Sequence, residues 1–176
     1  MQLIERVRDT EFLGREFLLW LWYNSEVRGG TYKLVDGDVE FWVDKKIVLR
    51  HDDDEGTEKI TCTGDNLLLK EARFALSENK QVTETQLRLK IEDNEFSFAL
   101  DSEWMNFKTF KSPKVMQDVD DDPEGIFYEK MFLIEQAIST VDTIFSEFIK
   151  LRTSPEWTDS VKPELLNWIS EVKNHP

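Results

Sequence analysis

EFLGREFLLWLWYNSEVRGG, residues 11–30, is a helix-length run with almost no polar face. A surface helix shows apolar residues every three to four positions, whereas here they are nearly continuous from Phe17 to Tyr23. A helix that is apolar on almost every side must be covered on most sides. Because large apolar residues are usually buried in folded proteins, we expect this segment to be the central core helix.

The ends of this helix are marked by residues with strong positional preferences. Thr10 is expected to cap its first turn, and Gly29 and Gly30 are expected to end it, because glycine accepts left-handed backbone. Residues 1–9 are read as a short lead-in, either helical or extended. Gly14 lies inside the helix, where glycine costs about 1 kcal/mol relative to alanine. We interpret it as a point where another segment packs closely against the helix.

The same stretch carries a resemblance to a known family. The pattern F-L-G-R-E-F-L-L-W-L-W-Y-x-S-E, residues 12–26, resembles a segment in the C-terminal half of longer members of the recombination-associated RdgC family. In that family, too, the segment is followed by a Gly-rich turn and a run of strands. The likeness continues through the strands of this chain and returns around residues 127–152 and the sequence F-I-K-L-R-T. It covers most of this chain but only about half of a full-length family member.

The resemblance implies a function. Members of the RdgC family are non-enzymatic, sequence-independent double-stranded DNA binders that act as ring-shaped dimers and restrain RecA-driven recombination. No DNA-contact motif of the family carries over residue by residue to this chain. A half-length chain cannot close a two-subunit ring in the same way, so a higher oligomer, a companion chain and loss of DNA binding all stay open. The matching positions are structural ones: Leu13, Gly14, Glu16, Trp20 and Trp22.

Length and composition fit one domain with a short tail. The chain has 176 residues, of which 40% are hydrophobic and 12% aromatic, and this is ample for a core. We expect a single α+β domain in residues 1–152 and a short helical extension in residues 153–176. The single cysteine excludes an internal disulfide framework and a multi-cysteine metal site.

Neither a membrane span nor a leader sequence is expected. The apolar run of residues 11–30 is too short, and too interrupted by Arg15 and Glu16, to cross a bilayer. The first ten residues, MQLIERVRDT, alternate in charge and lack the apolar region of a signal peptide. We therefore expect a cytoplasmic protein with no membrane partner.

The formal net charge of −14 argues against indiscriminate DNA binding, because attraction to phosphate supplies most non-specific affinity. The charge is unevenly distributed along the chain. Residues 115–176 carry 13 acidic and 5 basic side chains, whereas residues 65–114 carry 9 acidic and 8 basic ones. A locally basic surface on the middle of the chain is therefore compatible with the overall charge.

Alternating apolar residues and turn signals predict an antiparallel sheet. Asp36-Gly37-Asp38 lies between two alternating runs, which is a strong signal for a β-hairpin. A helix is expected at residues 66–78, capped by Asp65. These elements predict an α+β fold: an antiparallel sheet of about seven strands packed against two long helices, with a short C-terminal helix at 163–172. The expected strands are residues 31–35, 39–43, 45–50, 57–63, 84–91, 95–100 and 104–110.

The second long helix is predicted at residues 125–151, with Pro123 at its start. Its apolar residues alternate between spacings of four and three, which is the 3.5-residue repeat of a bundle or coiled-coil seam. This seam is expected to pack on the first helix or on a second subunit. Further apolar residues widen the stripe, which favours packing inside a globular core. The seam residues are Phe127, Met131, Ile134, Ile138, Val141, Phe145 and Phe148.

No arrangement typical of catalysis is found in the sequence. Only His51 and His175 are available as histidines, and there is no nucleophile elbow, phosphate-cradling loop or Cys–His pair. Cys62 is expected to pack in a strand, because no basic neighbour in the sequence would lower the pKa of its thiol. We therefore expect a non-enzymatic protein without a cofactor.

The acidic connector before the second long helix has the spacing of a calcium-binding loop at five positions. Pro123, however, stands where the sharp turn of such a loop needs glycine, and Gly125 stands where an apolar β-branched residue is usual. A charged connector that caps the helix is the better interpretation, and no metal site is predicted. The acidic residues concerned are Asp118, Asp120, Asp122, Glu124 and Glu129.

The remaining positive signal is a set of basic residues in the strands. If the strands belong to one sheet, their outer faces join these residues into a basic track suited to phosphate contacts, which need only Lys or Arg at suitable spacing. The alternative interpretation is ordinary sheet-surface lysines, which also protect strand edges from aggregation. The candidate DNA-binding residues are Lys45, Lys46, Arg50, Arg88, Lys90, Lys108, Lys111 and Lys114.

Three function hypotheses follow. The first, implied by the RdgC resemblance, is a self-associating double-stranded DNA-binding protein linked to control of recombination, with a recombination protein as a further partner. The second is an acidic protein–protein adaptor or a DNA-mimicking inhibitor of a DNA-handling protein, suggested by the charge of −14. An enzyme is the third and least supported hypothesis.

Overall fold

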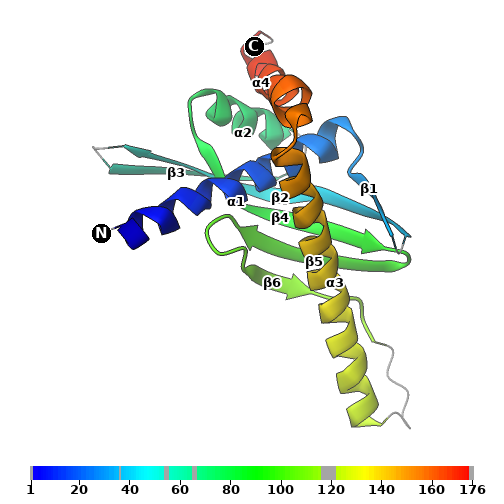
Figure 1. Ribbon diagram of the computed structural model, residues 1–176. Helices are drawn as coiled ribbons and strands as arrows, with labels where there is room; N and C mark the ends of the chain where they lie inside the picture. The colour runs from blue at the N-terminus through cyan, green and yellow to red at the C-terminus, as the bar shows by residue number, and fades with distance from the viewer. Residues whose placement is uncertain (1, 36, 54–55, 65–66, 116–121, 175–176) are drawn as a thin grey trace.

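The computed structural model describes residues 2–35, 37–53, 56–64, 67–115 and 122–174 as six strands and four α-helices (Figure 1). A π-helical turn, Trp157–Val161, precedes the last α-helix, and a 3-10 turn, Glu171–Asn174, follows it. The main elements are α1 (Gln2–Val27), β1 (Thr31–Leu34), β2 (Gly37–Asp53), β3 (Gly56–Thr63), α2 (Leu67–Ser77), β4 (Gln81–Ile91), β5 (Asn94–Asp101), β6 (Phe107–Lys111), α3 (Pro123–Arg152) and α4 (Lys162–Ser170).

The strands form one antiparallel sheet in the order β1-β2-β4-β5-β6, and β3 pairs with the same edge of β2 as β1 does. The predicted α+β class and antiparallel sheet are thus confirmed, with six strands in place of seven. The strands expected at 39–43 and 45–50 are one continuous strand, β2, whose register shifts between Asp44 and Ile47. Such a shift interrupts the apolar alternation without ending the strand.

The helices lie on one face of the sheet (Figure 1). Along β4, Leu87 and Leu89 point toward the helices and are fully buried, so the inner face follows the predicted alternation. The two long helices meet through aromatic side chains. The ring centroids of Phe17 and Phe145 are 4.9 Å apart, and those of Trp20 and Phe148 are 5.4 Å apart. The prediction that the two long helices form the core is therefore confirmed.

Glycines shape α1 as its sequence predicts. A β-carbon on Gly14 would lie 2.0 Å from the Ser102 carbonyl oxygen, so Gly14 is the expected close-packing point. Gly29 and Gly30 follow the helix with φ angles of 72° and 65°. The expected start was wrong, because α1 begins at Gln2 and Thr10 lies inside it.

One further boundary differs from prediction, and another agrees with it. The last strand begins at Phe107 and not at 104, because the Asp101 carboxylate accepts a hydrogen bond from the Trp104 backbone N–H (2.8 Å) and holds a turn there. The start of α3 agrees with prediction: Pro123 is its first residue, and the Asp122 side chain accepts from the Glu124 N–H (3.2 Å). The Asp65 cap and the acidic positions 118 and 120 lie outside the described residues.

The α3 seam divides into two parts. Val141 and Phe148 are buried in this chain's own core, and Phe145 packs against it, so these three do not form an intersubunit seam. Phe127, Met131 and Ile138 are exposed on the first half of the helix, and Ile134 is half-buried. The buried residues of α3 do not coincide with the predicted 3.5-residue repeat, because a straight α-helix has 3.6 residues per turn. They are Leu133, Ala137, Val141, Ile144 and Phe148.

Candidate nucleic-acid interface

The outer face of the sheet is not covered by any of the described helices and carries most of the predicted basic residues. Arg88 and Lys90 of β4 alternate with the buried leucines and therefore point to this face. Strand register places Arg88 beside Trp42 of β2 on one side and beside Ser97 of β5 on the other. Ser97 in turn pairs with Lys111 of β6. One row of side chains thus crosses four strands.

Two irregularities concentrate lysines on this face. In β6, Lys111 pairs with Ser97 and Lys108 with Ala99, so both lysines face outward although three positions separate them. One of the two residues between them, Thr109, has a positive φ of 52°, as expected of a bulge that changes which face the following residues occupy. In β2, the register shift between Asp44 and Ile47 leaves Lys45 and Lys46 as two extra residues that are not opposite any residue of β4.

Four cations converge on one shallow cavity on this face, which we call the cationic hollow. It has a volume of about 590 Å³ and also contains the polar side chains of Thr63, Gln86, Ser97 and Thr109. Its two acidic residues are Asp44 and Glu95, so its formal charge is positive in a chain of charge −14. The four cations come from three strands: Lys45, Lys46, Arg88 and Lys111.

Carboxylates lie between the basic residues on this face. The predicted basic track did not include these carboxylates. The Arg88 guanidinium lies 2.9 Å from the Asp44 carboxylate and 3.4 Å from the Glu95 carboxylate. Lys90 lies 3.8 Å from Glu40. Ion pairs at such partly exposed positions contribute about 0–1 kcal/mol, so they exchange readily with a phosphate. Lys45 and Lys111 are exposed, and the part of the chain that the structure describes contains no ion pair to either.

Glu84 joins two of the lysines at the margin of the hollow. Its carboxylate lies 2.8 Å from the Lys46 amine and 2.9 Å from the Lys108 amine, and Lys108 also approaches Asp101 at 3.4 Å. Burial alone would raise the pKa of Glu84, but the hydrogen bonds and charges of the two lysines outweigh it and lower that pKa. The hydrogen bond to Glu84 is the main cause that raises the pKa of Lys108. Glu84 is therefore charged at neutral pH and holds both lysines in place.

The other predicted residues lie around this centre. Lys90 is the next outward-facing residue of β4, two positions beyond Arg88. Arg50 lines a neighbouring cavity of about 280 Å³ together with Lys59 and Lys108. Lys114 is exposed and follows the end of β6. The structure thus brings half of the eight predicted residues together and distributes the others over the adjoining surface.

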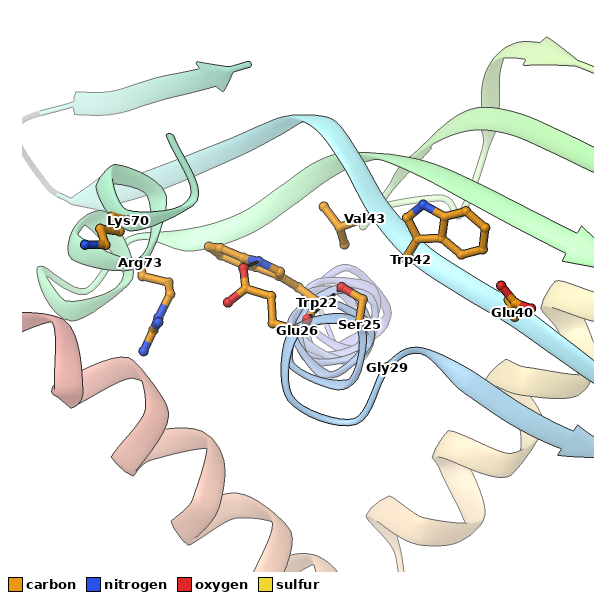
Figure 2. A pocket seen from close by; sticks show the side chains of 9 residues that line it. All are labelled: Trp22, Ser25, Glu26, Gly29, Glu40, Trp42, Val43, Lys70 and Arg73. Atoms are coloured by element: carbon orange, nitrogen blue, oxygen red, sulfur yellow. Dashed lines mark hydrogen bonds between the residues drawn. The ribbon is translucent and has the colours of Figure 1, made fainter. Parts of the chain in front are cut away.

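A second cavity, of about 590 Å³, was not anticipated from the sequence. It lies at the edge of β2 where neither β1 nor β3 pairs with residues 41–45, and we call it the edge gap. Figure 2 shows that α1, β2 and α2 supply its walls. The strand spacing that creates it depends on long-range pairing of β3, which no local pattern reveals. The lining residues are Trp22, Ser25, Glu26, Gly29, Glu40, Trp42, Val43, Lys70 and Arg73.

The charged groups of the edge gap are partly committed to other contacts. Glu26 accepts a hydrogen bond from the Trp22 indole (2.5 Å), and burial of its carboxyl raises its pKa. Arg73 stacks 4.5 Å above the Trp168 ring, donates to the Trp168 carbonyl and lies 3.7 Å from Glu171. These contacts fix the wall formed by α1 and α2.

No model of a known protein family matches the chain, and no curated protein matches it. The resemblance to the RdgC family therefore stays a prediction from the sequence. Among the described residues, no helix is long and apolar enough to cross a membrane, and no group of three or more His, Cys, Asp or Glu side chains is arranged to hold a metal ion. Cys62 is buried, and this burial raises the pKa of its thiol.

Proposed function

We propose that this protein is a non-enzymatic, sequence-independent double-stranded DNA-binding protein that contacts phosphates through the outer face of its sheet. The observation that carries the proposal is the convergence of Lys45, Lys46, Arg88 and Lys111 on one hollow of the uncovered face. The RdgC resemblance supplies the expected link to control of recombination. Contacts of this kind position a protein on DNA and carry no sequence information.

The charge distribution supports a one-sided contact. Residues 115–176, which include α3 and α4, carry 13 of the 36 acidic residues but only 5 of the 22 basic ones. The excess negative charge of this segment repels phosphate, and the hollow attracts it. Duplex DNA is therefore expected to approach the sheet face. At that position the negative charge of residues 115–176 is farther from the DNA, and salt screens its repulsion strongly.

Fluorescence anisotropy of a labelled duplex tests the proposal. Binding should be measurable at about 20 mM salt and weaken steeply toward 150 mM, with a log–log slope of about −3 to −4 if each hollow cation contacts one phosphate. Replacing two of these cations, in Lys45→Glu with Lys111→Glu, should reduce that slope by about 2 and weaken binding strongly.

A matched control changes the same charge elsewhere. The double variant Lys150→Glu with Lys162→Glu alters two exposed lysines on α3 and α4 and should bind the duplex almost as the wild type does. No binding at low salt, or equal losses in the two double variants, would contradict the proposal.

A second candidate function is assembly with protein partners through α3. Its first half exposes large apolar side chains on a helix that extends past the sheet (Figure 1). Phe127, Tyr128 and Phe132 are each about 60% exposed (58%, 62% and 62%). Exposed apolar clusters of this kind are typical of interaction sites. The observation fits both self-association and the acidic adaptor hypothesis.

A further inference from the structure

The edge gap leaves one residue of β2 with its backbone hydrogen-bonding groups directed into a cavity. The Phe41 N–H donates to the Gly30 carbonyl (2.8 Å), and the Lys45 carbonyl accepts from the Gly64 N–H (2.8 Å). Bonding direction alternates along an antiparallel strand, so Val43, midway between them, directs its N–H and C=O to the same edge. No described strand pairs with Val43 on that edge.

The gap is short and closed at both ends. Gly30 and Gly64 occupy the positions opposite Phe41 and Lys45. Between them, about three residues of β2, roughly 10 Å of strand, have no partner strand on that edge among the described residues. A peptide that extends a sheet runs along its edge for several residues, and the two glycines block that path. The opening suits a compact planar group that presents one hydrogen-bond acceptor beside one donor.

The walls of the gap also suit a planar ligand. A group paired with Val43 lies in the plane of the sheet, with the half-buried Trp42 on its outer side and Ser25 of α1 on its inner side, near Gly29 of the turn after the helix (Figure 2). The volume of about 590 Å³ is in the range of small-molecule sites. The lining residues carry two acids and two bases, so the gap favours a ligand group without net charge.

We propose that the edge gap binds a nucleobase, pairing its Watson–Crick edge with the N–H and C=O of Val43 and stacking its face on Trp42. All four DNA bases present a donor beside an acceptor on that edge, and every base has a face that stacks on an aromatic ring. The base belongs to a free nucleoside or to an unstacked nucleotide. In the second case the nucleic acid strand that carries the base runs past the cationic hollow, because Trp42 pairs in register with Arg88, which lines the hollow. The inference does not depend on duplex binding.

Nuclear magnetic resonance of the isotope-labelled full chain tests this directly. Adenosine, cytidine, guanosine or thymidine, and separately a short oligothymidylate, are titrated while the backbone amide of Val43 is followed. Saturable shifts at Val43 with the nucleosides support the proposal. Shifts with the oligothymidylate alone support it too, and assign the base to a nucleic acid strand.

Two tryptophan variants locate the site. Trp42→Ala should weaken the Val43 response about tenfold or more, the loss expected when a stacking partner is removed. Trp104→Ala changes an exposed tryptophan outside the gap and should leave the response unchanged. Because Trp42 lies on the outer face, its variant should retain the wild-type spectrum elsewhere.

Three outcomes would overturn the proposal: no shift at Val43 with either class of ligand, a shift unaffected by Trp42→Ala, or an equal shift with an N-acetyl amino-acid amide, which would assign the gap to peptide. If duplex DNA still binds in any of these cases, the sheet-face proposal stands and only the nucleobase site is lost.

Discussion

Gly14 is a residue at which α1 packs directly on backbone, that of Ser102 just after β5. An alanine β-carbon there would lie 2.0 Å from a backbone oxygen of Ser102, and backbone atoms cannot rotate away as a side chain does. Gly14→Ala should therefore lower the free energy of unfolding by about 2–3 kcal/mol, measured by urea denaturation. Gly125→Ala is the matched control, because nothing lies within 4 Å of its β-carbon and it should stabilise α3 by up to about 1 kcal/mol. Equal effects of the two changes would show that α1 does not pack as described.

Glu84 gives the sheet face a pH dependence whose sign follows from its lowered pKa. An acid with a lower pKa in the folded state stabilises the fold above its unfolded pKa, and loses that contribution as pH falls through the folded value. Glu84→Gln should cost about 1 kcal/mol near pH 7, and the difference from wild type should narrow as pH is lowered toward about 3. Chemical denaturation at a series of pH values measures both effects. Glu135→Gln, an exposed change on α3, should show neither, and a pH-independent loss for Glu84→Gln would refute the linkage.

At the scale of elements, α3 contains two halves that differ in burial. Its second half is part of the core, while its first half exposes Phe127, Tyr128 and Phe132. Replacing these three by serine should leave the midpoint of thermal unfolding almost unchanged, because they contribute little to this chain's core. If α3 mediates assembly, the wild type should be oligomeric by light scattering after size exclusion and the triple variant should be smaller.

A variant in the buried second half of α3 is the control for the triple variant. Phe148→Ala should lower stability by about 3–5 kcal/mol, because Phe148 is fully buried beside Phe17 and Trp20. A wild type that is monomeric at all concentrations would exclude self-association through the exposed half and leave the adaptor hypothesis to be tested with other proteins.

The elements also show where sequence patterns lose information. The central helix apart from its start, the β1–β2 pairing and the inner face of β4 follow from local sequence patterns and were predicted correctly. The bulge at Thr109 and the register shift after Asp44 were not, because a bulge changes which face the following residues occupy without altering composition. These two irregularities place Lys45, Lys46 and Lys111 together, so the residues of the hollow were predicted but their convergence was not.

At the scale of the whole molecule, the charge is unevenly distributed. The helices α3 and α4 carry more acidic than basic residues, whereas the opposite sheet face alternates cations and carboxylates and has a positive centre at the hollow. Net charge alone therefore suggested poor DNA binding, and strand order was needed to locate a surface where binding is favoured. The edge gap could not be predicted from the sequence either, because its boundaries depend on which strands pair with β2.

The most direct test of DNA binding through the sheet face is lysine footprinting, in which an acetylating reagent modifies the free and duplex-bound protein and each site is quantified by mass spectrometry. The sheet-face account predicts that duplex DNA protects Lys45, Lys46 and Lys111, while Lys150 and Lys162 react equally in both states. Protection of the α3 and α4 lysines, or no difference at the three hollow lysines under conditions where binding is saturated, would contradict it.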